Sequence, residues 1–105
     1  MRYYTANADR ITGAVLTTNQ WYHIAVARSG TSTKLFVDGV QSGSTYTDSN
    51  DYGNTAPLGI GTYFSAGTPY TTDTLNGYLD DIRITKGYAR YTANFTAPTA
   101  PFVTK

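Results

Sequence analysis

Tyrosines and side chains with hydrogen-bonding oxygens or amides gather in two stretches of the sequence, and together they have the chemistry of a sugar-binding site. A sugar has an apolar C–H face and a polar rim, which an aromatic ring and Asp or Asn side chains can match. Loops on a rigid scaffold commonly carry such sites. Tyrosine is equally typical of protein–protein interfaces, so the sequence leaves both uses open. The candidate residues are Tyr46, Asp48, Asn50, Tyr52 and Asn54 in one loop, and Tyr63, Tyr70 and Asp73 in the next.

The first of these loops also offers ligands for a hard cation. Asp48, Asn50 and Asp51 place several oxygen atoms within four residues, and Ca²⁺ prefers oxygen ligands. The run matches no EF-hand pattern, and Asp and Asn in loops usually hydrogen-bond to their own backbone. A calcium site and a self-bonded turn are therefore the two interpretations of this segment, and no other cofactor is expected.

Catalysis is the function that the sequence argues against. Glycoside hydrolysis needs two carboxyl groups roughly 5–10 Å apart across one bond, whereas the adjacent Asp80 and Asp81 would point to opposite faces of a strand. The single His23 lies within an apolar segment, which favours a packed residue over a member of a Ser-His-Asp triad. The chain has no Glu and no Cys, so a thiol nucleophile and thiolate metal sites are excluded. We predict no catalytic residue and no enzymatic activity.

Charge and hydropathy exclude two further classes of function. The formal net charge is +1, which provides no broad basic surface for nucleic acid. No apolar run approaches the roughly 20 residues that a membrane-spanning helix needs, so we expect no membrane insertion. Residues 1–5 lack the apolar middle region of a signal peptide, and secretion by that route is not indicated.

The elements that must position these residues are β-strands. Threonine and tyrosine are abundant and helix formers such as Leu, Met and Glu are scarce or absent, a composition that suits pleated, half-buried surfaces. Residues 21–28 are apolar on both faces, which predicts a central strand with Trp21 in the core. Asp38-Gly39 is a strong two-residue hairpin signal, and a helical turn is expected near residues 88–90. The expected strands are residues 2–6, 10–16, 21–28, 34–37, 40–47, 58–62 and 77–85, with long loops at 48–57 and 63–74, all within one module of residues 1–105.

Several motifs, taken in order across residues 15–102, resemble the C-terminal half of a laminin-G-like, concanavalin A-type jelly roll. The last of them is similar to versions found in bacteriophage tail and structural proteins. The motifs are Trp21–Arg28 (WYHIAVAR) with Leu35–Gly39 (LFVDG), then Leu58–Gly61 (LGIG), and finally Gly77–Ile84 (GYLDDIRI) with Gly87–Tyr91 and Asn94–Pro98.

The resemblance implies an all-β fold, an antiparallel β-sandwich that is shortened or partial: a fragment, a naturally short module, or half of a sandwich completed by another copy. Domains of this family usually run some tens of residues longer, with several strands before the tryptophan strand, whereas only 20 residues precede Trp21 here. A half-sandwich would expose strand edges and an apolar face, which promote association. We therefore predict a homo-oligomer, formed by packing or strand exchange, within a larger assembly.

The resemblance also bears on function. Enzymes of this family use a pair of Glu on one strand, which this chain lacks, and many relatives bind calcium. The leading hypothesis is a non-catalytic module for carbohydrate recognition or adhesion in a phage tail or surface assembly, with a glycan or host-surface receptor as partner. The alternative is a purely structural oligomerisation module of a virion or surface protein. A glycan-cleaving enzyme ranks third, because it would need a carboxyl pair facing one cleft. The expected location is the virion, the extracellular space or the cell surface.

Overall fold

The chain is all-β, and its described part consists of antiparallel strands and loops. The computed structural model describes residues 1–53, 57–65, 68–69, 71–72 and 74–103. The chain divides into two compact units, Met1–Ser49 together with Ile84–Lys105 as the first and Asn50–Arg83 as the second. No helix occurs among the described residues, so the structure describes no segment that could cross a membrane as a helix. The predicted fold class is confirmed.

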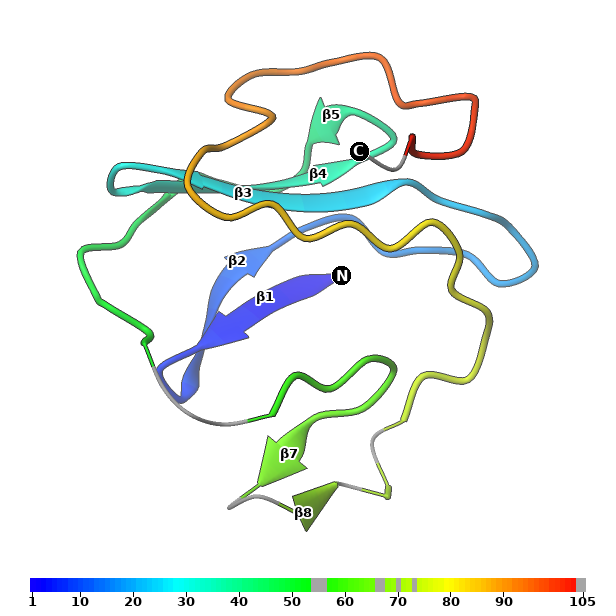
Figure 1. Ribbon diagram of the computed structural model, residues 1–105, viewed down its shortest axis with the longest axis horizontal. Coiled ribbons are helices and arrows are strands. Elements are labelled where there is room, and N and C mark those ends of the chain that lie inside the picture. The colour runs from blue at the N-terminus through cyan, green and yellow to red at the C-terminus, as the bar shows by residue number, and fades with distance from the viewer. Residues whose placement is uncertain (54–56, 66–67, 70, 73, 104–105) are drawn as a thin grey trace. The chain divides into compact units, whose positions relative to one another are not determined.

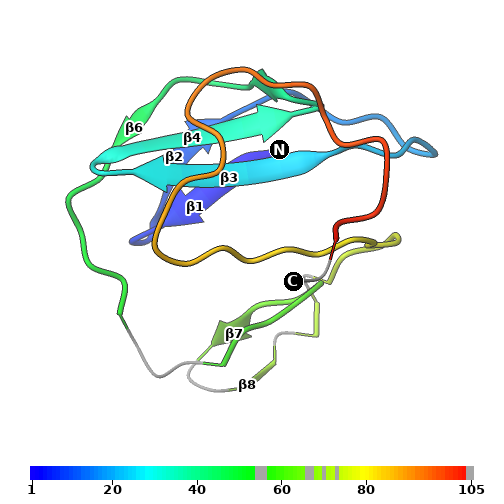
Figure 2. The ribbon, with the colours of Figure 1, turned by 45° about the horizontal axis from the view of Figure 1, so that its top comes forward.

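Strands β1 to β6, labelled in Figures 1 and 2, belong to the first unit. β1 and β2 form a hairpin, and β3 pairs along its whole length with β4. Two short strands, β5 and β6, pair antiparallel with opposite ends of β4. In the second unit β7 and β8 form a small hairpin. The bounds are β1 Arg2–Thr5, β2 Ala8–Thr12, β3 Ile24–Ser29, β4 Ser32–Val37, β5 Val40–Gln41, β6 Tyr46–Thr47, β7 Phe64–Ser65 and β8 Thr68–Pro69.

The turn at Asp38-Gly39 organises the first unit. Both residues have positive φ, 50° and 82°, as the favoured two-residue hairpin turn requires. The Asp38 amide donates to the His23 carbonyl and the Asp38 carboxylate accepts from the His23 amide, both at 2.8 Å. The Gly39 carbonyl accepts from the Phe95 amide at 2.9 Å, and a Cβ at Gly39 would collide with the Phe95 carbonyl oxygen. The predicted turn is confirmed, and its hydrogen bonds also connect it to His23 and Phe95, which are distant in sequence.

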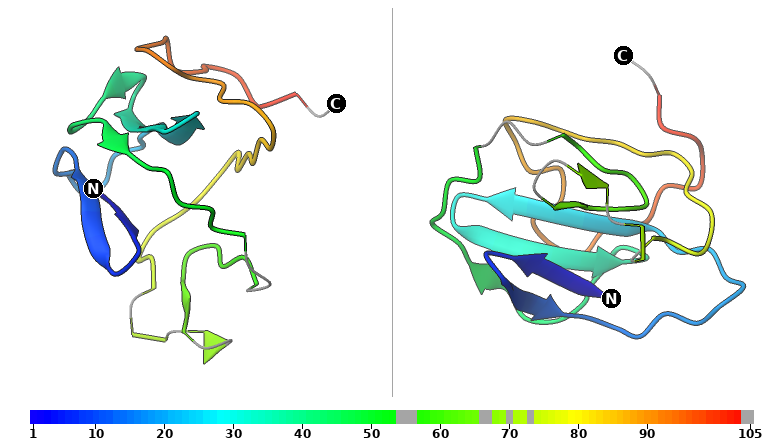
Figure 3. Two further views of the ribbon diagram at one scale, coloured as in Figure 1. Left: turned by 90° about the vertical axis from the view of Figure 1, so that its left-hand side faces the viewer. Right: turned by 90° about the horizontal axis from the view of Figure 1, so that it is seen from below.

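The core lies on both faces of β4, because successive side chains of a strand point to opposite sides. Leu35 is buried on the side of Gly13, at the end of the β1–β2 hairpin, and Figure 3 shows this hairpin beside β3 and β4. Phe36, 0% exposed, meets the ring of Phe95 edge-on at 5.4 Å. The rings of Phe95 and Tyr91 are stacked with their centroids 3.5 Å apart. The hairpin and the C-terminal tail thus cover opposite faces of one strand.

The C-terminal tail is held by hydrogen bonds as well as by rings. Lys34 Nζ donates to the Thr92 carbonyl at 2.7 Å, and the backbone amide of Gln41 donates to Asn94 Oδ1 at 2.9 Å. Arg90 donates to Thr85 Oγ1 at 2.7 Å and lies over the Tyr88 ring. Residues 88–90 do not form a helix, and the predicted helical turn is wrong, because the tail gains its hydrogen bonds from other segments and not from its own backbone.

The prediction of a central strand over residues 21–28 is wrong in position and in burial. β3 begins only at Ile24, because the left-handed Asp38 ends the ladder opposite His23. Among the described residues β3 pairs with β4 alone, which makes it an edge strand, and Ile24 and Val26 are 38% and 50% exposed. Trp21 lies in the loop before β3 and is 66% exposed, so it is not a core residue.

Two other predicted strands are absent from the described residues. Residues 58–62 and 77–85 form no ladder, although both sequences alternate or cluster apolar residues. An extended segment becomes a strand only when a neighbour accepts and donates its backbone hydrogen bonds. The short hairpin of β7 and β8 instead lies within the predicted loop at 63–74. The returning strand predicted at 40–47 is broken into β5 and β6 around Gly43, whose φ is +83°.

Candidate functional site

The residues predicted to form one binding loop fall in both units. Tyr46 lies in β6 of the first unit, where the guanidinium of Arg10 is 5.4 Å from its ring centroid. The Arg10 Nε donates to the Thr5 carbonyl at 3.2 Å. Tyr46 is half-buried, so its ring is partly occupied by a neighbour from the β1–β2 hairpin.

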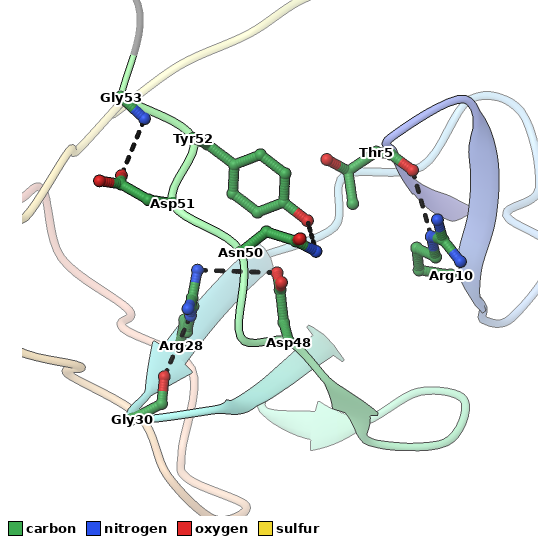
Figure 4. A network of polar contacts seen from close by, with 9 residues as sticks. All are labelled: Thr5, Arg10, Arg28, Gly30, Asp48, Asn50, Asp51, Tyr52 and Gly53. Carbon is green, nitrogen blue, oxygen red and sulfur yellow. Dashed lines mark hydrogen bonds and ion pairs between the residues drawn. The ribbon is translucent and has the colours of Figure 1, made fainter.

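Asp48 is the best-anchored of the candidates. Its side chain is 0% exposed, its Oδ2 lies 3.7 Å from Arg28 Nη1, and its amide donates to the Thr31 carbonyl at 2.7 Å. Arg28 in turn donates from Nε to the Gly30 carbonyl at 3.0 Å, as Figure 4 shows. These contacts tie the segment after β6 to the β3–β4 turn. Removing Arg28 would leave a buried carboxylate without its opposite charge, which is destabilising, and the buried Asp48 side chain presents no surface to a ligand.

The remaining described candidates belong to the second unit and are exposed. Asn50 Nδ2 donates to the Tyr52 hydroxyl at 3.4 Å, and the Gly53 amide donates to Asp51 Oδ1 at 2.9 Å, both drawn in Figure 4. The second contact is an Asx-type turn, in which a carboxylate caps its own backbone. Tyr52 and Tyr63 are 38% and 47% exposed, so each presents ring surface to a ligand.

Three predicted binding residues, Asn54, Tyr70 and Asp73, lie outside the described residues. The predictions at these positions therefore stay predictions. What the structure does bring together from the first predicted loop is the local group of Asn50, Asp51 and Tyr52, held by two hydrogen bonds that each span two residues.

The acidic residues proposed as calcium ligands have other partners. Asp48 faces Arg28, and Asp51 accepts from the Gly53 amide. Within the ranges that the structure describes, no group of three or more His, Cys, Asp or Glu side chains could hold a metal ion. Ca²⁺ also accepts amide and backbone carbonyl oxygens as ligands, so calcium binding stays a prediction from the sequence.

The residues weighed for catalysis have the following surroundings. The Asp81 amide donates to Asp80 Oδ1 at 2.8 Å, and both side chains are exposed in the second unit. His23, in the first unit, meets the rings of Tyr91, Phe95 and Phe102 edge-on at 5.5 to 6.3 Å. The packed role predicted for His23 is confirmed, although the residue lies just before β3 and not within a strand.

One exposed aromatic residue was missed by the sequence reasoning. Trp21 follows the polar turn residues Thr17–Gln20 and precedes the apolar strand, and its apolar neighbours pointed to the core. The signal that could have placed it outside is the turn itself, since loops run over the surface. The structure places Trp21 on that loop, 66% exposed.

Comparison with families of known proteins gives a match for most of the chain. Residues 2–90 match the family model described as the concanavalin A-like lectin/glucanases superfamily. This range covers every described strand. Neither the comparison with curated proteins nor that with solved structures gave a match.

Proposed function

Because the chain belongs to the concanavalin A-like lectin/glucanase superfamily, we propose that it is a non-catalytic carbohydrate-binding module. The observation that carries the proposal is the exposed ring of Tyr52, whose hydroxyl is held by Asn50. An exposed ring offers an apolar face to the C–H surface of a sugar, and the Asn50 amide supplies polar groups at its edge. Tyr63 offers a second exposed ring in the same unit.

A binding role without catalysis is supported by the carboxylates that the chain has. The superfamily includes glucanases, and glycoside hydrolysis needs two carboxyl groups set across one bond. The chain has no Glu, and the backbone amide of Asp81 caps the side chain of Asp80. That contact joins adjacent residues, and among the residues that the structure describes neither side chain gains a partner that would prepare it as a general acid.

The proposed setting is a larger surface assembly, such as a phage tail or another virion or cell-surface structure, containing several copies of the chain. The edge strand β3 supports association. Its outer edge has no described partner, and Ile24 and Val26 are partly exposed on one face. Such edges pair readily with other chains. The same observation favours a second candidate function, a structural module that only assembles copies.

A glycan array followed by calorimetry tests the proposed function. We expect a bound glycan, and we expect Tyr52→Ala to weaken its binding at least about tenfold, which corresponds to about 1.4 kcal/mol. Tyr78→Ala is the matched control, because Tyr78 lies in the same unit, is 87% exposed and takes no part in the proposed site. An array without hits, together with a multimer in light scattering, would favour the structural module.

Calcium is tested separately by thermal unfolding. A melting temperature that rises with millimolar CaCl₂, and no longer rises in Asp51→Asn, would establish a site that includes Asp51. MgCl₂ at the same ionic strength is the control for screening of surface charges. An unchanged melting curve would end the calcium prediction.

A further inference from the structure

The loop of residues 15–22, here called the tryptophan loop, is closed at both ends by hydrogen bonds. At its start, the Ala14 amide donates to Ser42 Oγ at 2.7 Å. At its end, His23 exchanges two hydrogen bonds of 2.8 Å with Asp38. The two ends are thus attached to the segments on either side of β5. Fixing both ends of a loop lowers the conformational entropy that a ligand must remove on binding.

The tip of the tryptophan loop is cross-linked by its own side chains. The Tyr22 hydroxyl accepts from the Thr17 amide at 3.2 Å, lies 2.7 Å from Thr17 Oγ1 and donates to Gln20 Oε1 at 3.2 Å. Between these residues, Asn19 adopts a φ of +60°, a conformation that Asn tolerates better than most residues. Side chain and backbone therefore specify one shape for the loop.

This shape presents Trp21 to solvent. The indole is 66% exposed, and tryptophan is usually well buried because of its large apolar surface. Within the part of the chain that the structure describes, neither the indole N–H nor the Gln20 amide nitrogen has a hydrogen-bond partner. The loop from 15 to 22 contains no Asp, Glu, Lys or Arg. The tryptophan loop thus carries an apolar indole face, two available donors and a neutral set of hydroxyl and amide groups.

We propose that the tryptophan loop is a saccharide-binding surface in its own right. The Trp21 indole stacks on the C–H face of a pyranose ring. The Gln20 amide donates to a hydroxyl of that ring, and the indole N–H, which lies in the plane of the indole, donates to a hydroxyl group beyond the edge of the indole. The class of ligand rests on the proposed function, whereas the site does not, because it lies in the first unit and shares no residue with the group around Tyr52. A neutral loop suits an uncharged sugar better than a charged partner.

The chain contains one tryptophan, so its fluorescence reports on this loop alone. We expect the wild-type emission to be strongly quenched by acrylamide, as for a solvated indole. We expect the methyl glycosides of glucose, galactose, mannose or N-acetylglucosamine to protect it and shift its emission. Trp21→Ala should weaken binding of the responding glycoside at least tenfold in calorimetry, while Tyr52→Ala leaves the emission shift in place. Circular dichroism of Trp21→Ala should match the wild type, since the side chain is exposed.

The outcomes separate this site from the one around Tyr52. If Tyr52→Ala lost glycan binding while Trp21→Ala bound fully, the proposal for the tryptophan loop would be overturned and the proposed function would remain. Emission that shifts with protein concentration alone would show that a second copy covers Trp21, and would also overturn the proposal. An emission that responds to no glycoside and resists acrylamide would contradict it as well.

Discussion

The two units of the chain differ in whether they bury any apolar side chain completely. The first unit buries Ile11, Leu35 and Phe36 between strands, hairpin and tail. No described residue of the second unit is fully buried. Most of its large apolar side chains are exposed, although its sequence is also rich in tyrosine and aliphatic residues. The exposed ones are Tyr52, Leu58, Ile60, Tyr63, Leu75, Tyr78, Leu79 and Ile82.

Hydrogen bonds follow the same division. In the first unit they join residues far apart in sequence, such as Lys34 with Thr92 and Gln41 with Asn94. In the second unit most described side-chain bonds span one or two residues, as between Asp51 and Gly53. Burial is therefore decided by which segments find a pairing partner, and apolar content alone does not decide it. Exposed apolar surface on the second unit is what a ligand or another copy would cover.

The strongest test of this contrast is removal of one large apolar side chain from each unit. Phe36→Ala removes a fully buried ring that contacts Phe95, and we expect a loss of roughly 3–5 kcal/mol in the free energy of unfolding. Leu79→Ala, at a 53% exposed position of the second unit, should change it by less than about 0.5 kcal/mol. Urea unfolding followed by circular dichroism measures both. Equal losses would mean that the second unit has a core of its own.

Gly39 tests whether the tail is part of the core of the first unit. Gly39→Ala would place a Cβ in a left-handed conformation and against the Phe95 carbonyl, so we expect a loss of roughly 2–4 kcal/mol. Gly30→Ala is the matched control. Its φ is also positive, +58°, but no atom lies within 4 Å of the added Cβ, and the strain alone costs about 1–2 kcal/mol. Similar losses for the two variants would show that the tail does not press on the turn.

The same residues show how far sequence could predict the structure. Asp38-Gly39 was predictable because the required φ values are a property of these two residue types and of their neighbours in sequence. The strand expected at 77–85 was not, because a strand depends on a partner that no local pattern names. Trp21 and Asp48 were misplaced for a related reason. Trp21 lies in a loop that the Thr17–Tyr22 contact cross-links, and Asp48 is buried facing Arg28 of β3, and both contacts join residues that no local pattern pairs.

A smaller effect is expected from Asp48, the buried acidic residue of the first unit. Asp48→Asn keeps the size of the side chain but removes the charge beside Arg28. We expect the free energy of unfolding to fall by about 1–2 kcal/mol. The loss is modest because the Arg28 side chain is partly exposed to solvent. Asp9→Asn breaks the Arg2–Asp9 pair, whose side chains are 67% and 37% exposed, and should cost about 0–1 kcal/mol. Thermal unfolding at low and high salt measures both. A larger loss for Asp9→Asn would contradict a structural role for buried Asp48.

The smallest effect is expected from removing one tyrosine hydroxyl group in each unit. Tyr22→Phe removes the hydroxyl that bonds Thr17 and Gln20, and we expect a loss of about 1 kcal/mol. Tyr78→Phe, in the second unit, removes a hydroxyl from an 87% exposed ring and should be neutral within about 0.5 kcal/mol. Because Trp21 is next to Tyr22, the fluorescence anisotropy of Trp21 should also fall in Tyr22→Phe as the loop loosens. An unchanged anisotropy would mean that the ends of the tryptophan loop, held at Ser42 and Asp38, are sufficient to fix it.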